Sequence, residues 1–199
     1  MADLEKTGKN LERRGFRVHR FASGAEAAEF LVQTLHGTSI GIGGSVTIDT
    51  LGVYDRLCGS NEVFWHWKNH APETRERAGK AETYLCSANG VSETGEIVNI
   101  DGFGNRVAGT IYGPERVFLV VGRNKIAPDL TGAIDRARNI AAPLNARRLS
   151  RHTPCAVGEP RCHDCRSPAR ICKGVCVLTR PMGGVGWTEV LLIGETLGY

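Results

Sequence analysis

Five of the seven cysteines in this 199-residue sequence fall between Cys155 and Cys176. Cys162 and Cys165 are separated by two residues, a spacing that lets both thiolates hold one ion, and further cysteines lie on either side. Four thiolates suit either a tetrahedral zinc ion or an iron–sulfur cluster. The spacing matches neither the double C-x2-C zinc pattern nor the ferredoxin pattern, so it does not identify the metal. The predicted ligands are Cys155, Cys162, Cys165 and Cys172.

Other interpretations of this cluster remain open. Cys162 and Cys165 could form a bare redox dithiol, although no thioredoxin-like sequence precedes them, or could be ordinary loop thiols. His152 or His163 could replace one of the thiolates as a ligand. The remaining cysteines lie near apolar residues and are expected to be buried structural residues rather than ligands: Cys58, Cys86 and Cys176.

A second candidate site is the turn Gly43-Gly44-Ser45, which follows a short apolar strand predicted at residues 39–42. Glycines let the chain turn sharply and leave its N–H groups uncovered. Ser45 or Thr47 can cap the helix predicted at residues 45–57, whose N-terminus carries partial positive charge and unpaired donors. The turn therefore predicts a binding site for an anion.

This turn does not satisfy the known nucleotide motifs. Gly41 and Gly43 begin the dinucleotide fingerprint, but Val46 stands where its third glycine belongs. No Lys-Ser or Lys-Thr pair follows to complete a phosphate loop. The sequence thus carries no flavin or nicotinamide fingerprint, and a glycine turn that holds no ligand is the structural alternative.

Composition and hydropathy limit the class of protein. Hydrophobic residues make up 41% and charged residues 23% of the chain, as in an ordinary globular protein with a sizeable core. The first residues contain no basic segment followed by an apolar run, so no signal peptide is predicted. No apolar stretch approaches the roughly 18 residues of a membrane helix. We therefore expect a cytoplasmic protein without a membrane partner.

Positive charge is concentrated around the cysteines. Residues 136–173 contain nine Arg or Lys but only Glu159 and Asp164, a local excess of +7 in a chain of net charge +4. Nucleic-acid binding is not expected, because no aromatic residues are interleaved with the basic ones. The arginines are instead expected to offset the negative charge of a metal held by thiolates.

The periodicity of apolar residues predicts alternating strands and helices. Strands are expected at residues 16–21, 39–42, 62–67, 83–87, 116–122, 175–179 and 189–193, with a further short strand between the turns at 92–95 and 101–105. Helices are expected at 3–14, from Ser23 to Leu35 with Glu26 completing a capping box, and at 45–57, 74–82 and 128–149. In the last of these, the residues expected to face inward are Ala133, Ile134, Ala137, Ile140 and Ala141. This alternation implies an α/β fold with a mixed, largely parallel sheet covered on both faces. We expect one domain over residues 1–199, with a cysteine-rich loop at 152–176.

Five stretches in the same order resemble the LUD-domain, or lactate-utilisation, family: 43–47, 99–107, 121–126, 141–146 and the cysteine stretch. The similarity runs from about Leu11 to Tyr199. It implies the fold shared by CoA transferases, ribose-5-phosphate isomerase and glucosamine-6-phosphate deaminase. It also implies a role in the oxidation of L-lactate to pyruvate, in members encoded with iron–sulfur partner subunits.

In folds of this kind, ligands lie at the carboxyl ends of the sheet strands, where the glycine turn would be. Arg106 and Lys125 suit a carboxylate or phosphate. Glu93 or Asp101 could act as a general base or as the covalent nucleophile that CoA transferases use, or could be solvated or tie down a turn. The predicted ligand-binding residues are Gly43, Gly44, Ser45, Thr47, Asn89, Asn105, Arg106 and Lys125.

Three functions are consistent with these features. The first is an accessory subunit of a lactate-oxidising complex with iron–sulfur partner subunits, which binds a small anionic ligand at the glycine turn. The second is an independent enzyme acting on a CoA thioester or a sugar phosphate. The third is a non-catalytic binding module stabilised by its metal, and the sequence leaves an oligomer open in each case.

Overall fold

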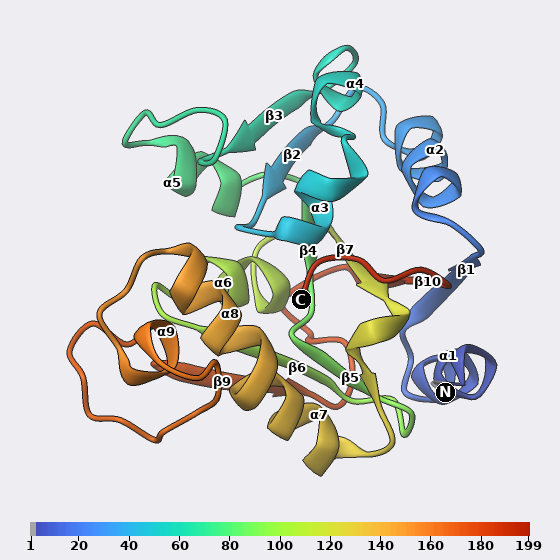
Figure 1. Cartoon of the computed structure of the whole chain (residues 1–199). Coiled ribbons are helices and arrows are strands. Elements are labelled where there is room, and N and C mark those ends of the chain that lie inside the picture. The colour runs from blue at the N-terminus through green and yellow to red at the C-terminus, as the bar shows by residue number, and fades with distance from the viewer. Residues whose placement is uncertain (1–2) are drawn as a thin grey trace.

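The computed structural model describes residues 3–199 and contains two β-sheets (Figure 1). The larger sheet is parallel throughout, in the order β1 (Arg17–Phe21), β10 (Trp187–Ile193), β7 (Arg116–Gly122), β4 (Thr83–Ser87), β2 (Ser39–Ile42) and β3 (Glu62–Trp65). The smaller sheet is mixed, in the order β8 (Ile126–Ala127), β5 (Gly90–Ser92), β6 (Ile97–Asp101) and β9 (Gly174–Leu178). The predicted α/β class with a mixed, largely parallel arrangement of strands is confirmed.

The helices fill the segments between strands. They are α1 (Leu4–Arg13), α2 (Gly24–Thr34), α3 (Val46–Leu51), α4 (Tyr54–Cys58), α5 (Thr74–Gly79), α6 (Asn105–Ile111), α7 (Leu130–Arg136), α8 (Ala142–Arg148) and α9 (Pro154–Val157). The Ser23 side chain accepts a hydrogen bond from the Glu26 amide at the start of α2, as expected of this cap. The Glu26 carboxylate accepts from the Ala22 amide, one residue before the position of an ideal capping box.

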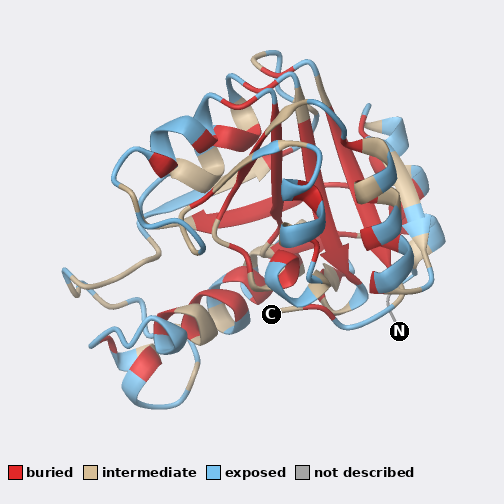
Figure 2. Ribbon diagram, turned by 90° about the horizontal axis from the view of Figure 1, so that it is seen from above, coloured by how far each residue is buried: buried red, intermediate tan, exposed pale blue. Residues whose placement is uncertain are grey.

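The chain is arranged in four layers. Alternate residues of the central strands face opposite sides of the large sheet: Phe118 and Val120 pack with α2, α3 and α4, whereas Leu119 and Val121 pack with α1 and the smaller sheet. The far side of the smaller sheet is covered by alanines of the long helical segment from α7 to α8. Figure 2 shows the buried strands at the centre, between exposed helical surfaces. This double covering explains why the central strands are continuous apolar runs.

The structure differs from the prediction at two places, near the glycine turn and in the middle of the chain. The helix expected at 45–57 is two short helices, because Gly52 adopts a left-handed conformation with φ of 63° and ends α3. Strand β5 and helix α6 had no predicted counterpart. Both are short, at three and seven residues, so their periodicity is too brief to detect.

The long helix expected at residues 128–149 is interrupted by a π-helical segment, η2 (Ala137–Ala141). Pro143 lies two residues beyond the end of this segment and has no amide proton, so a regular α-helix would leave a carbonyl without its usual donor there. The wider turn rotates Ile140 outward, and its side chain is 45% exposed. The expectation that Ile140 faces inward was therefore wrong, whereas Ala133, Ala137 and Ala141 are fully buried.

No helix in the described part of the chain has the length and apolar character needed to cross a bilayer. The cysteine-rich loop lies between α8 and β9 and contains α9.

Candidate functional site

Three neighbouring parallel strands, β2, β4 and β7, end at the same edge of the large sheet. Gly43-Gly44-Ser45 follows β2, Ser87 ends β4, and Lys125 follows β7 within the short 3-10 helix η1 (Arg123–Lys125). Because parallel strands place their carboxyl ends together, residues distant in sequence meet here. This edge is where the resemblance had predicted a ligand.

Lys125 lies at the centre of this edge and is only 3% exposed. Its Nζ donates to Thr47 Oγ1 at 2.7 Å, Ser87 Oγ at 2.9 Å and the Ala88 carbonyl at 3.2 Å. Each hydroxyl in turn donates to a carbonyl, Ser87 to Val120 at 2.6 Å and Thr47 to Leu197 at 3.4 Å. Since both hydroxyl protons point elsewhere, Nζ supplies all three protons, and the arrangement fits an ammonium ion.

Among the described residues, 3–199, no carboxylate pairs with the ammonium of Lys125. Burial lowers its pKa to about 7, and the charges of Arg136 and Arg106 lower it in the same direction. Its charged form is therefore about half populated at neutral pH. An anion placed beside Nζ would favour the ammonium and raise this pKa again.

Arg106 has its guanidinium hydrogen bonds occupied by the protein. Nη1 donates to the Ser87 carbonyl at 3.1 Å and to Asn99 Oδ1, while Nη2 donates to Asn89 Oδ1 at 2.8 Å and the Ile100 carbonyl at 2.6 Å. These contacts connect the end of β4 to β6. Arg106 thus contributes a fixed charge to the site rather than a free bidentate clamp.

Arg136 is a third cation in the same region. It projects from α7, and its guanidinium donates to the Asn124 carbonyl at 2.7 Å and to the Asn89 carbonyl. Burial lowers its pKa to about 10, so it stays charged at neutral pH. Within residues 3–199, no carboxylate lies within 4 Å of the charged nitrogens of Lys125, Arg106 or Arg136.

The glycine turn forms one wall of this region. Ser45 caps α3, accepting from the Ile48 amide at 3.2 Å, as predicted. A Cβ added to Gly43 would lie 3.0 Å from the Tyr84 hydroxyl, and one on Gly44 would lie 3.2 Å from Trp67 Nε1. Since α3 has only six residues, Lys125 supplies the positive charge here, and the helix contributes little.

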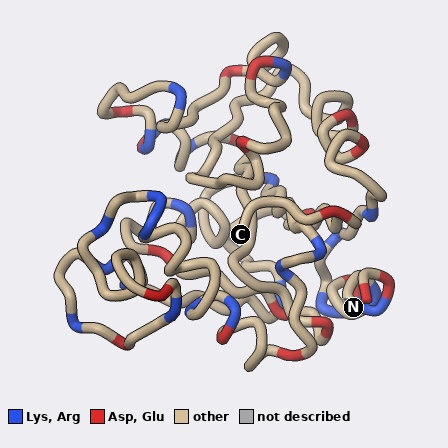
Figure 3. The backbone as a smooth tube through the Cα atoms, in the orientation of Figure 1, with Lys and Arg blue, Asp and Glu red and all other residues tan. Residues whose placement is uncertain are grey.

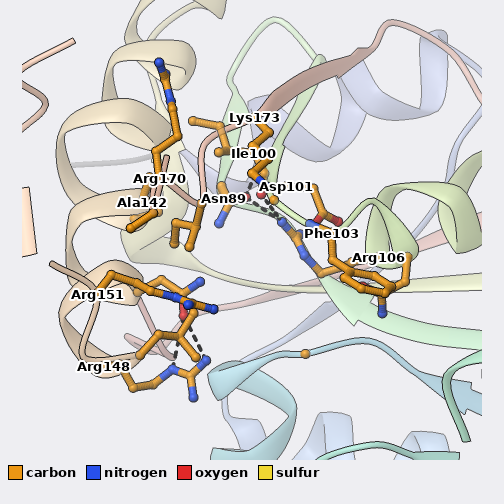
Figure 4. Close-up of a pocket in the computed structure, with 18 of the residues that line it drawn as sticks. Asn89, Ile100, Asp101, Phe103, Arg106, Ala142, Arg148, Arg151, Arg170 and Lys173 are labelled. Carbon is orange, nitrogen blue, oxygen red and sulfur yellow. Dashed lines mark hydrogen bonds between the residues drawn. The ribbon is translucent and has the colours of Figure 1, made fainter. Parts of the chain in front are cut away.

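Two adjacent hollows lie beside these residues. An inner chamber of about 50 Å³ is lined by Ser45, Thr47, Ser87 and Lys125, among others. A wider cavity of about 360 Å³ lies beside it, between α8, the end of β6 and the cysteine-rich loop. Figure 4 shows Arg148 and Arg151 on one wall of this cavity and Arg106 and Phe103 on the opposite wall. The two hollows share Gly44, Trp67, Asn89, Arg106 and Asn145.

The remaining predicted ligand-binding residues lie at this junction. Asn89 lines both hollows, and its Oδ1 accepts from the Ile100 amide at 2.8 Å as well as from Arg106. Asn105 lines the wide cavity, and its backbone carbonyl accepts from the Tyr84 hydroxyl at 3.2 Å. The structure thus gathers all eight residues that were predicted to bind the ligand around one edge of the sheet.

The two predicted catalytic carboxylates are placed differently. Asp101 lines the wide cavity and accepts from the amides of Phe103, Gly104 and Val107 at 3.0–3.1 Å. Burial acts to raise the pKa of Asp101, but these amides and the charge of Arg106 outweigh it and lower the pKa. Glu93 lies instead against α1, where it accepts from Lys6 Nζ at 2.9 Å and the Asp3 amide at 3.1 Å. The structure does not bring Glu93 to the strand ends.

Several residues of the site were missed at the sequence level. Ser87 is the last residue of an apolar strand, and ligand-binding residues of parallel sheets occur at this end of the strands. Arg136 is an arginine on the alanine face of a helix, between Ala133 and Ala137, which indicates a buried charge. Trp67 and Asn145 carried no signal of their own for this site.

The four cysteines predicted to bind metal line one small pocket of about 20 Å³. Arg170 Nε donates to Cys172 Sγ at 3.3 Å, and the Asp164 amide donates to Cys162 Sγ at 3.4 Å. Arg138 Nη2 contacts Cys162 Sγ at 3.8 Å, and Figure 3 shows basic residues along α8 and the cysteine-rich loop.

The same thiols are not arranged around a common point. In the described range, no three His, Cys, Asp or Glu side chains converge closely enough to hold a metal ion as they stand. The four thiols are suitable ligands for a metal, but the cysteine-rich loop would have to close to bring their sulfur atoms around one point. Of the other cysteines, Cys86 is buried, Cys176 is partly buried on β9, and Cys58 is exposed at the end of α4, contrary to the expectation of a buried residue there.

Comparison with known proteins agrees with this architecture. Residues 4–193 match the profile of the LUD domain. A search of curated proteins found no match. Among solved structures, the chain is similar to a DUF162 family protein from Deinococcus radiodurans, with a TM-score of 0.57 and 15% identity over 96% of each chain. That likeness supports the fold, and the profile covers nearly the whole sequence. The chain belongs to the LUD-domain family.

Proposed function

We propose that this protein binds a small carboxylate or phosphate anion in the inner chamber, beside Lys125. The observation that carries the proposal is the buried ammonium of Lys125, which has three neutral hydrogen-bond acceptors and no carboxylate partner in the described part of the chain. A buried charge without a counterion is costly, and an incoming anion would remove much of that cost. The 50 Å³ chamber has room for only a small anionic group.

The surrounding cations favour the same ligand. Arg106 and Arg136 are held in place by protein carbonyl and amide oxygens, so their charges need no reorganisation when an anion enters. Burial reduces the dielectric screening between these charges and a bound anion. The main-chain turn at Gly44 leaves the chamber open, since no side chain projects from that position.

The family membership leads us to propose a role for this site. The resemblance to the lactate-utilisation family implies an accessory subunit that supports L-lactate oxidation together with iron–sulfur partner subunits. In this role the anion held beside Lys125 would be a carboxylate of that reaction or the anionic group of its cofactor. A strain lacking the gene should lose growth on L-lactate, and the Lys125→Met variant should fail to restore it.

Binding is tested directly with the purified protein. Calorimetric titrations with L-lactate, pyruvate and inorganic phosphate at pH 6.5 should show at least one ligand that binds the wild type. Lys125→Met should weaken that binding by about tenfold or more, because the neutral side chain cannot pair with an anion. Lys9→Met, which removes an exposed lysine on α1, is the matched control and should bind as the wild type does. Equal binding by Lys125→Met and the wild type would overturn the proposal.

We also propose that Cys155, Cys162, Cys165 and Cys172 take up a metal by closing the loop around it. The support is the pocket that all four share and the guanidinium donors that contact two of the sulfurs. Protein purified without oxygen should contain zinc, or iron with sulfide, and the double variant Cys162→Ser/Cys165→Ser should lose it. Cys58→Ser removes an exposed cysteine elsewhere and should leave the metal content unchanged. Metal-free wild-type protein would contradict this assignment.

A further inference from the structure

The wide cavity beside the inner chamber is lined by cations that the small-anion site does not explain. Beyond Arg106, its walls include Arg75, Arg148, Arg151, Arg170 and Lys173, against the single acidic residue Asp101. None of these six cations forms a salt bridge with any carboxylate of residues 3–199. Elsewhere on the surface, neighbouring basic residues such as Arg77 and Arg138 do have acidic partners, at 2.6 and 3.0 Å.

The five cations beyond Arg106 come from three separate segments. Arg75 is on α5, Arg148 and Arg151 are at the end of α8 and beyond it, and Lys173 is in the cysteine-rich segment before β9. Bringing like charges together in a concave site is unfavourable, so their convergence points to a ligand with several negative charges. A single small anion in the inner chamber would leave this outer set unpaired.

Aromatic side chains line the same cavity. Phe103 is 78% exposed, and the Arg75 guanidinium lies over its ring at 5.3 Å. Trp67 lines both hollows, and the Arg148 guanidinium stacks on its ring at 4.4 Å. An exposed aromatic ring with a cation above it offers a surface for a planar group. Arg148 is held there by Asn145 Oδ1 and the Tyr199 hydroxyl, both at 2.9 Å from its nitrogens.

Building on the anion site proposed above, we propose that the ligand is a phosphorylated molecule of the nucleotide class. Its terminal phosphate occupies the inner chamber beside Lys125, the next phosphate lies among the cations of the wide cavity, and its planar ring packs on Phe103. The cavity of about 360 Å³ lies within the size range of small-molecule sites, roughly 300–1,000 Å³. Gly44, Asn89 and Arg106 line both hollows, so the two lie side by side.

The test compares three probes that fill successive parts of the site: inorganic phosphate, pyrophosphate and ADP. In calorimetry at low ionic strength, pyrophosphate and ADP should bind at least about tenfold more tightly than phosphate. Arg151→Gln/Lys173→Gln changes two exposed side chains of the cavity and should weaken both extended probes by about tenfold, with little effect on phosphate. Phe103→Ser should weaken ADP severalfold and leave pyrophosphate unchanged.

A control variant that loses the same charge elsewhere distinguishes an effect of the cavity residues from a general effect of reduced positive charge. Arg166→Gln/Arg180→Gln removes two exposed arginines outside the cavity and should bind all three probes as the wild type does. Equal affinities for phosphate, pyrophosphate and ADP would overturn the inference. If phosphate binding still depended on Lys125, that result would leave the small-anion site standing. Loss of ADP affinity in the control pair as large as in the cavity pair would also overturn the inference.

Discussion

The buried ammonium of Lys125 makes a quantitative prediction about stability and pH. In the folded protein the pKa of Lys125 is about 7, whereas its ordinary value is 10.5. Between these values the unfolded chain binds one more proton than the folded chain, so unfolding becomes less favourable as the pH rises. Each pH unit in this window contributes about 1.4 kcal/mol, less near pH 7, where the folded lysine is already half neutral. From pH 7 to pH 9, Lys125 should therefore add about 2 kcal/mol of stability.

The measurement is urea unfolding of the wild type and Lys125→Met at pH 7, 8 and 9, without added anions. Other titrating groups affect both proteins, so the difference between their unfolding free energies isolates Lys125. That difference should change by about 2 kcal/mol in favour of the wild type between pH 7 and pH 9. Lys173→Met, which removes an exposed lysine, should show no such change relative to the wild type. A constant difference between wild type and Lys125→Met would refute the assignment of a destabilised ammonium.

Three further predictions concern the scaffold around the site. Gly41→Ala should destabilise the protein by about 3 kcal/mol or more in urea unfolding, since the added Cβ would lie 2.0 Å from the Ala78 carbonyl oxygen. The control Gly79→Ala should cost little, because the Cβ added there would meet open space. Ile140→Ser should change the free energy of unfolding by under about 0.5 kcal/mol, because the Ile140 side chain is exposed. Ile134→Ser should cost more than about 1 kcal/mol, because Ile134 packs against the core between the smaller sheet and the α7–α8 segment. Equal costs for the two variants would contradict the π-helical register. Asp101→Asn should cost about 1–2 kcal/mol at pH 7 by weakening three charge-assisted bonds. Because the pKa of Asp101 is lowered in the folded state, this cost should be fully present above the ordinary carboxyl pKa and should be lost as the pH falls through the lowered folded-state pKa. A cost that persisted below the folded-state pKa would argue against the charged turn.

The sequence predicted the elements that carry a long or clear apolar pattern. The strand at 116–122 is apolar because both of its faces are covered, and its position agrees with β7. The cap at Ser45 and the strand-end positions of Gly43, Gly44 and Lys125 follow from local chemistry that a single segment contains. These local features were enough to predict an anion site at one edge of the sheet.

What the sequence could not provide is the order of the strands. Thr47, Ser87 and Lys125 meet because β2, β4 and β7 are adjacent, and that adjacency depends on contacts between segments far apart in sequence. Helical periodicity also assumes regular turns, so the π-helical segment at Ala137–Ala141 reversed the expected orientation of Ile140. The separation of Glu93 from the site likewise depends on the position of α1.

The central claim is that Lys125 is a buried cation whose role is to bind an anion, and NMR can test it directly. The 13Cε shift of Lys125, assigned by comparison with Lys125→Met, should titrate with a pKa near 7 in the free protein. Addition of inorganic phosphate should raise that pKa, since the bound anion favours the ammonium. A pKa near 10.5 that does not respond to phosphate would contradict both the buried cation and the anion site.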